Sequence, residues 1–267
     1  MNKAEQALRE LGEMDTLSAG DSPVHALCPL SKLLVTVIYI AVTVSFGKYA
    51  LTRLVPMALF PVLLFQISGV PMRLCFRKLR FVLPLVLAVG LFNPVLDRAT
   101  YLTLGGVTVS GGVVSMLTLM LKGTLCLTAS FLLMATTRIE ALCAALRRVH
   151  VPGLLVTLLL LTYRYVGVMT EEVAVMTGAY QLRAPGHRGI HYSAWGSFLG
   201  QLLLRSMDRA EELYDSMLLR GFSDRFYYAG AQQLTKADAA YLACCAASFL
   251  LLRFVDVTRL LGGLVVG

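Results

Sequence analysis

Two arginines at the ends of helical patterns are the side chains of this sequence best suited to binding a partner protein. They lie in Leu182-Arg183-Ala184 and Leu219-Arg220-Gly221. A guanidinium group donates several hydrogen bonds to a carboxylate or to backbone carbonyls, and a small neighbouring residue lets another surface approach closely. Each end alone is explained by an arginine that complements a helix dipole. Their occurrence as a pair on adjacent helices favours docking.

No other motif indicates catalysis or nucleotide binding. The sequence contains no HExxH, GxSxG or GxxxxGK[ST] pattern, and no apolar segment carries paired Asp or Glu residues. His187 and His191 are four residues apart, but Gly186 and Gly189 favour a surface pair in a loop over a metal site. The six cysteines form no CxxC motif, so buried thiols are expected rather than a metal or disulfide framework. We therefore expect no enzyme activity, no bound metal and no cofactor on this chain.

The composition indicates an integral membrane protein. Of 267 residues, 57% are hydrophobic and 15% are charged, and the mean hydropathy is +0.70; soluble domains carry about 25% charged residues. The net charge of +8 comes from basic residues in loops and in one long segment, without the interleaved aromatic residues of a nucleic-acid site. Residues 1–21 are polar and mixed in charge, unlike a secretory signal. The lipid bilayer is thus an expected partner, and nucleic acid is not.

Six apolar runs are candidate membrane spans, at roughly 33–47, 50–68, 81–96, 113–135, 153–170 and 238–254. The four basic residues within 73–80 predict a cytoplasmic loop, and residues 97–112, with one arginine, predict an outer loop. Within that outer loop, the alternation from Leu102 to Ser110 fits a small β-hairpin about as well as an irregular loop.

The run 153–170 conflicts with the charge rule, because basic segments expected to be cytoplasmic lie on both sides of it. Arg164, in the middle of the run and flanked by Tyr163 and Tyr165, suits a membrane interface better than a bilayer centre. We therefore predict that this run does not cross. The expected fold is an all-α integral membrane protein with about five transmembrane helices and long cytoplasmic helices. Its expected regions are a cytoplasmic N-terminal segment (1–32), transmembrane helices 1–4 (33–135), a cytoplasmic helical region (136–237), and a final transmembrane helix with the C-terminal tail (238–267).

Three helices are predicted in the cytoplasmic region, at roughly 138–149, 152–183 and 193–220. Thr137 and Glu140 have the spacing of a capping box at the start of the first helix. The third helix is amphipathic, and its polar face offers the pairs Arg205–Asp208 and Arg209–Glu212. Its apolar stripe consists of Leu199, Leu203, Met207, Ala210, Leu213, Tyr214 and Met217.

Over nearly its whole length the chain resembles the transmembrane T component of energy-coupling factor (ECF) importers, which are ABC transporters. The stretch from Asp21 to Leu33, Thr136-Thr137 followed by an amphipathic helix and Pro152, and the two arginine motifs carry the resemblance. The most specific part is the second motif with its approach, in the segments Leu204-Arg205-Ser206, Arg209-Ala210-Glu211 and Met217-Leu218-Leu219-Arg220-Gly221-Phe222. Tyr163-Arg164-Tyr165 is closest to the cobalt-transport CbiQ branch. The chain departs from the family at Cys28 and Leu30, where Asp and Arg are usual, and in the first motif, which lacks the leading Ala and the Gly.

The charge rule predicts a cytoplasmic N-terminus and, with five spans, an outer C-terminus. The resemblance implies a non-catalytic scaffold in the prokaryotic cell membrane. Its partners would be two cytoplasmic ABC ATPase subunits, which bind the ATP, and a separate substrate-binding membrane subunit, the S component. Arg183 and Arg220 would sit in grooves on the ATPases, and the apolar helix faces, including 153–170, would hold the S component. Cobalt is the implied substrate, with nickel or a vitamin as alternatives. A self-sufficient secondary transporter is a further alternative, for which Asn93-Pro94 and Lys122 are the best intramembrane candidates.

Overall fold

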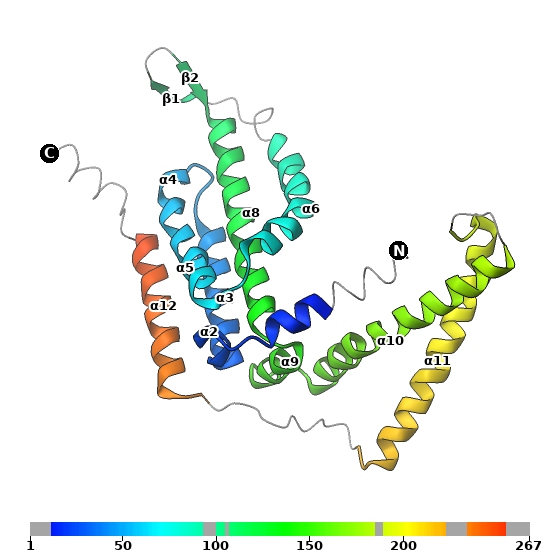
Figure 1. Ribbon diagram of the computed structural model, residues 1–267. Coiled ribbons are helices and arrows are strands. Elements are labelled where there is room, and N and C mark those ends of the chain that lie inside the picture. Colours follow the sequence, from blue (N-terminus) through cyan, green and yellow to red (C-terminus); the bar gives the residue numbers. More distant parts are fainter. Residues whose placement is uncertain (1–11, 93–99, 105–106, 185–188, 223–233, 255–267) are drawn as a thin grey trace. The chain divides into compact units, whose positions relative to one another are not determined.

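The computed structural model describes residues 12–92, 100–104, 107–184, 189–222 and 234–254 (Figure 1). Within these residues the chain is helical apart from one two-stranded hairpin. It forms two compact units. Unit 1 comprises residues 1–16 and 139–231, and unit 2 comprises residues 17–138 and 232–267. The predicted all-α architecture is confirmed.

Unit 2 is built from apolar helices packed around a long central one. Its elements are α2 (Pro23–Ala26), α3 (Pro29–Ser45), α4 (Leu51–Leu54), η1 (Val55–Ala58), α5 (Leu59–Ser68), α6 (Met72–Leu91), β1 (Thr100–Leu104), β2 (Val107–Ser110), α8 (Gly111–Thr136) and α12 (Lys236–Phe254). Helix α8 packs against α3, α4, α5 and α6, and α12 packs against α3. Strands β1 and β2 pair antiparallel, so the alternating segment after Tyr101 does form a hairpin.

Four helical segments are long and apolar enough to cross a membrane: Leu51–Ser68, α8, α12 and α10 (Gly153–Arg183). Two shorter apolar segments are Pro29–Ser45 and Val82–Leu91. At about 1.5 Å per residue, the 17 residues of α3 extend about 26 Å, close to the roughly 30 Å of a hydrocarbon core. Length and composition thus qualify α10 as a span, and the expectation that it does not cross stays a prediction.

The predicted basic loop over residues 73–80 is wrong, because these residues form the first turns of α6. The helix begins directly after Pro71, which occupies its N-cap position. Arg, Lys and Leu are strong helix formers, so the basic segment continues the apolar helix instead of interrupting it. Pro84 lies inside α6, where it removes one backbone hydrogen bond, and the helix changes direction along its length (Figure 1).

A buried tyrosine compensates for a proline in the core of unit 2. Pro61 has no N–H for the α-helical bond to the carbonyl of Met57, and the segment Val55–Ala58 adopts a 3₁₀ helix. The hydroxyl of Tyr39, which is fully buried, donates to this carbonyl at 3.0 Å. The Tyr39 ring packs against Phe60 and Phe249, with centroids 4.8 and 5.2 Å away. Since an unsatisfied carbonyl is costly in lipid, this contact stabilises the irregular span.

Two cations bind the C-terminal end of α3. The Nζ of Lys122, on α8, donates to the carbonyls of Val44 (3.2 Å) and Phe46. The guanidinium of Arg253, on α12, donates to the carbonyl of Ser45 at 3.0 Å and lies over the Phe46 ring. The last carbonyls of a helix lack intrahelical donors and carry the negative end of its dipole. Lys122 is therefore engaged with a neighbouring helix, which removes one of the two side chains that suggested a secondary transporter.

Unit 1 contains α9 (Ile139–Arg148), α10 (Gly153–Arg183), η2 (Tyr192–Ala194) and α11 (Trp195–Leu219). The bounds of α9, α10 and α11 lie within two residues of the sequence prediction, which did not include η2. Residues 12–18 form a further helix. Helix α9 ends in a Schellman motif, in which His150 takes φ +68° and the Val151 N–H donates to the Leu146 carbonyl at 3.3 Å. Helix α11 ends in the same way, with Gly221 at φ +78° and the Phe222 N–H donating to the Met217 carbonyl at 3.0 Å.

Replacing Lys122 by Met should lower the thermal stability of the detergent-solubilised protein. The substitution leaves the carbonyls of Val44 and Phe46 without this donor, and a typical hydrogen bond contributes about 0.5–1.5 kcal/mol net. The measurement is the unfolding transition followed by circular dichroism. Lys236→Met, at an exposed position, is the matched control and should leave the transition unchanged. Equal transitions for the two variants would contradict this role of Lys122.

Replacing Gly221 by Ala should loosen the last turn of α11. The left-handed conformation at φ +78° costs Ala about 1 kcal/mol more than Gly. Amide hydrogen exchange of residues 213–219 should therefore accelerate about fivefold. Gly200→Ala, inside the same helix and with open space around the added Cβ, should slow that exchange, because Ala favours helix. A slower exchange for both variants would show that the left-handed turn does not limit the helix end.

Candidate docking ends and the junction cluster

The first predicted docking motif lies at the exposed end of α10. Arg183 is the last residue of the helix, and Ala184 follows as its C-cap, donating its N–H to the Tyr180 carbonyl at 3.0 Å. Leu182 has 86% of its surface exposed, and the Arg183 side chain is also exposed. The sequence predicted the arginine at the helix end, but not a neighbouring leucine almost fully in solvent.

The second motif has the same composition at the end of α11. Leu219 is the last helical residue and 90% exposed, Arg220 is the C-cap, and Gly221 provides the left-handed turn after it. Arginine is among the side chains that dominate protein interfaces, and the exposed leucine adds apolar surface beside it. Gly221 is fully explained by the helix stop, so the residues left for binding are Leu219 and Arg220.

The two motifs lie at opposite ends of α11. The C-terminal end of α10 lies near the N-terminal end of α11, and the two helices then diverge (Figure 1). The N–H of His191 donates to the Tyr180 hydroxyl at this joint (3.3 Å). The 25 residues of α11 extend about 37 Å at about 1.5 Å per residue. Arg183 and Arg220 therefore cannot serve one small site, but they suit two separate surfaces.

One of the two predicted ion pairs on α11 is wrong. Arg205 donates to Glu172 on α10 instead of pairing with Asp208. The predicted pair Arg209–Glu212 forms at 3.4 Å. The sequence offered Arg205 a partner one turn away, but the neighbouring helix brings a carboxylate that bridges the two helices. This pair joins α10 to α11 about three turns from their common joint.

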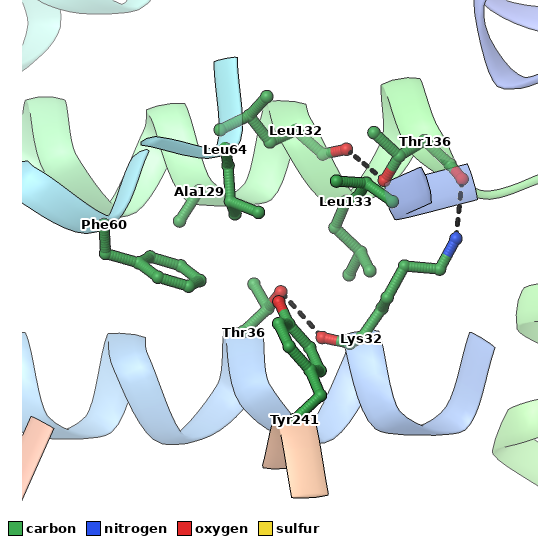
Figure 2. A pocket seen from close by; sticks show the side chains of 10 residues that line it. Lys32, Thr36, Phe60, Leu64, Ala129, Leu132, Leu133, Thr136 and Tyr241 are labelled. Carbon is green, nitrogen blue, oxygen red and sulfur yellow. Dashed lines mark hydrogen bonds between the residues drawn. The ribbon is translucent and has the colours of Figure 1, made fainter. Parts of the chain in front are cut away.

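A buried polar cluster in unit 2 was not predicted as a site. Lys32, in the first turn of α3, is 5% exposed. Its Nζ donates to the carbonyl of Thr136, the last residue of α8, at 2.7 Å (Figure 2). It also lies 3.5 Å from the His25 carbonyl. A lysine charge at the C-terminus of α8 complements the helix dipole and satisfies a carbonyl without an intrahelical donor.

Asp238 joins the start of α12 to the start of α3. It is 4% exposed, and its carboxylate accepts the N–H of Cys28 at 2.8 Å. It also accepts the N–H and the hydroxyl of Thr235, at 2.9 and 2.6 Å. Thr235 and Asp238 thus form the capping box of α12, while the same carboxylate also binds the backbone of Cys28. Because Cys28 is the N-cap of α3, one side chain fixes two helix starts.

His25 connects the segment before α2 to the start of α3. Its Nε2 donates to the Leu17 carbonyl at 3.1 Å, so its Nδ1 accepts the Ser22 hydroxyl at 2.7 Å. A Cβ on Gly20 would lie 3.1 Å from the His25 ring, so glycine permits this close approach. We refer to Ser22, His25, Cys28, Lys32, Thr136, Thr235 and Asp238 as the junction cluster. All of these residues belong to unit 2.

The predicted capping box of Thr137 and Glu140 is wrong. Helix α9 begins at Ile139, so Thr137 lies one residue before the N-cap position. Its hydroxyl is buried and has no hydrogen-bond partner. The Thr136 hydroxyl instead donates to the Leu132 carbonyl at 2.7 Å, inside α8. Thr136 therefore bonds within the end of α8, and in the described residues neither threonine hydroxyl caps α9.

A small pocket lies beside the cluster in unit 2 (Figure 2). Polar groups of Lys32, Thr36, Thr136 and Tyr241 line it. Its apolar walls are Val24, Phe60, Leu64, Ala129, Leu132 and Leu133. In the described part of the chain, no three His, Cys, Asp or Glu side chains gather as a metal-ligand set. Asn93, Pro94 and His187 lie outside the described residues.

Comparison with known proteins identifies a family. Residues 20–228 match the family described as cobalt transport protein, CbiQ. Cobalt transport protein CbiQ of Rhodobacter capsulatus is 37% identical over 92 residues, 34% of this chain and 37% of the relative. Nickel permease LarQ of Lactiplantibacillus plantarum is 28% identical over 120 residues, 45% of this chain and 43% of the relative. An uncharacterized protein of Methanocaldococcus jannaschii is 24% identical over 134 residues, 49% and 46%.

The chain spans less than half the length of each of these curated relatives. The family match is longer, and it includes both arginine motifs, Lys32 and Thr136, while Asp238 lies beyond it. The resemblance to the cobalt branch is thereby confirmed. With its membrane-length apolar helices, the chain is a multi-pass membrane protein that belongs to the CbiQ cobalt transport protein family.

Proposed function

We propose that this protein is the transmembrane scaffold and coupling subunit of an energy-coupling factor importer for cobalt or nickel. The observation that carries the proposal is the pair of exposed Leu-Arg helix ends on α10 and α11. Two cytoplasmic ABC ATPase subunits would each receive one end. They would bind and hydrolyse the ATP, and this chain would carry no catalytic group. A vitamin is the less supported substrate, because the named relatives are a cobalt transport protein and a nickel permease.

The apolar faces of the two long helices suit a membrane partner. Large apolar side chains remain exposed on both of them: Leu154, Leu155, Leu158 and Leu159 on α10, and Leu199, Leu203, Met207 and Tyr214 on α11. Among the residues that the structure describes, none of those in α11 is buried. Exposed apolar surface of this extent marks a protein or membrane contact. A substrate-binding S component is the partner that we assign to it.

The proposed cytoplasmic position of α10 rests on two observations at its middle, one exposed charge and one hydrogen bond. Arg164 is exposed, although a charge facing lipid near a bilayer centre costs a few kcal/mol or more. The neighbouring Tyr163 donates its hydroxyl to Asp15 at 2.6 Å. Asp15 belongs to the polar N-terminal segment, which cannot enter hydrocarbon cheaply. This contact supports a position of Tyr163 at the polar level of the N-terminal segment, which we assign to the cytoplasmic surface of the membrane.

Charge reversal at the helix ends should separate the ATPases from this subunit. Arg220→Glu places a carboxylate where the partner accepts hydrogen bonds, so ATPase co-purification and metal uptake should fall at least tenfold. Arg183→Glu should have a milder effect, because its motif lacks the family's Gly. The measurements are pull-down of the ATPases and cellular uptake of Co²⁺ and Ni²⁺.

Arg209→Glu is the control for these variants. It reverses an exposed charge on α11 that pairs within its own helix, so assembly should persist. If a protein carrying both Arg183→Glu and Arg220→Glu still co-purifies with its ATPases and supports full uptake, the docking proposal is wrong.

A topology reporter fused after residue 225 should be located in the cytoplasm, because an α10 that does not cross leaves both of its ends on the N-terminal side. Paired fusions of a cytoplasm-active fluorescent protein and a periplasm-active phosphatase measure this. A fusion after residue 92 is the control and should report the outer side. Phosphatase activity at residue 225 would make α10 a true span.

A further inference from the structure

The chain passes between the two units three times, after Thr16, after Arg138 and after Ala231. Next to each passage, a residue of unit 2 is bonded to the junction cluster. Leu17 follows the first passage and accepts from His25. Thr136 precedes the second and accepts from Lys32. Thr235 follows the third and donates to Asp238. Leu17, Thr136 and Thr235, which flank the three passages, are thus all hydrogen-bonded within the junction cluster of unit 2.

We infer that the junction cluster is the anchor through which movement of unit 1 reaches the helices of unit 2, with Lys32 and Asp238 as its positioning residues. The inference rests on the proposed coupling function and adds the place where coupling enters the membrane helices. It concerns residues that touch neither ATPase nor substrate.

The hydrogen bonds that hold Leu17, Thr136 and Thr235 converge at the start of α3. Lys32 lies in its first turn and holds the end of α8. The N–H of Cys28, the N-cap of this helix, is held by Asp238, which also holds the start of α12. His25 lies three residues before Cys28 and holds Leu17. A displacement of Leu17, Thr136 or Thr235 therefore acts on the same first turn of α3.

The bonds of the cluster are suited to transmit a displacement rather than absorb it. Lys32, Thr136 and Asp238 are each no more than 5% exposed, and both charged side chains bind backbone groups. Hydrogen bonds to charged groups are shorter and about twice as strong as neutral ones. Breaking one would leave a buried charge or carbonyl without its partner, which is costly away from water.

Lys122 provides a matched control at the other end of α3. It too is a lysine of unit 2 that donates to the terminal carbonyls of a helix. No passage between the units adjoins the carbonyls that it binds, at Val44 and Phe46. The two lysines therefore share their chemistry and differ in whether a connection between the units is attached.

The test is nucleotide-dependent hydrogen exchange on the complex purified with its co-purifying ATPases. The variants are Lys32→Met, Asp238→Asn, both together, the conservative Lys32→Arg, and Lys122→Met. In the unsubstituted complex, ATP with vanadate should change the exchange of peptides from α10 and α11 and also from α3, α8 and α12. In Lys32→Met and Asp238→Asn, the change in α10 and α11 should remain, and the change in unit 2 should fall at least threefold. Lys32→Arg should restore it.

A second measurement of coupling is the ratio of Co²⁺ or Ni²⁺ ions taken up to ATP molecules hydrolysed in proteoliposomes. This ratio should fall at least tenfold for Lys32→Met and stay within twofold for Lys122→Met, although Lys122→Met lowers stability.

The inference is wrong if Lys32→Met and Lys122→Met affect exchange in unit 2 alike, or if unit 2 in the Lys32→Met complex responds to nucleotide as before. It is also wrong if α10 and α11 respond in the unsubstituted complex while unit 2 never does, a result that leaves the docking proposal intact. If α10 and α11 themselves show no response to nucleotide, the proposed coupling function fails and the inference fails with it.

Discussion

The structure depends on cations that bind the last carbonyls of helices. A helix that ends inside or beside a membrane leaves up to four carbonyls without intrahelical donors, and lipid offers none. In unit 2, Lys32 binds the end of α8, and Lys122 and Arg253 bind the end of α3. Each of these side chains comes from a different helix than the one it caps, so every cap is also a tertiary contact. The same bonds that satisfy the backbone thus fix how the helices pack.

This arrangement also accounts for basic residues where the charge rule does not expect them. Arg253 lies at the end of the final helix, on the side predicted to be outside, where basic residues are disfavoured. Its guanidinium is held by Ser45 and lies over the Phe46 ring, so it completes the end of α3 instead of facing an anionic leaflet. Counting charges along the sequence therefore gives topology only after the charges used as helix caps are set aside.

The helices could be predicted from the sequence, but their polar tertiary contacts could not. Period, proline and small-residue stops located α9, α10 and α11 within two residues, because these signals are local. The start of α6 was missed, since a run of Arg and Lys continues a helix as readily as it forms a loop. The spacing of Thr235 and Asp238 is a visible capping signal. The partners of Lys32 and of Asp238, however, lie 104 and 210 residues away, and only the fold brings them together.

The ion pair of Arg205 and Glu172 influences how freely the angle between α10 and α11 can change. Their side chains keep 52% and 27% of their surface exposed, so water and salt screen the attraction. Exposed ion pairs contribute about 0.2–1 kcal/mol, comparable with thermal energy. The pair lies about 16 Å along each helix from their joint, at about 1.5 Å per residue, so it sets a preferred opening angle without locking it. The angle between the two helices can therefore change at little energetic cost, so their free ends can follow two surfaces that move apart.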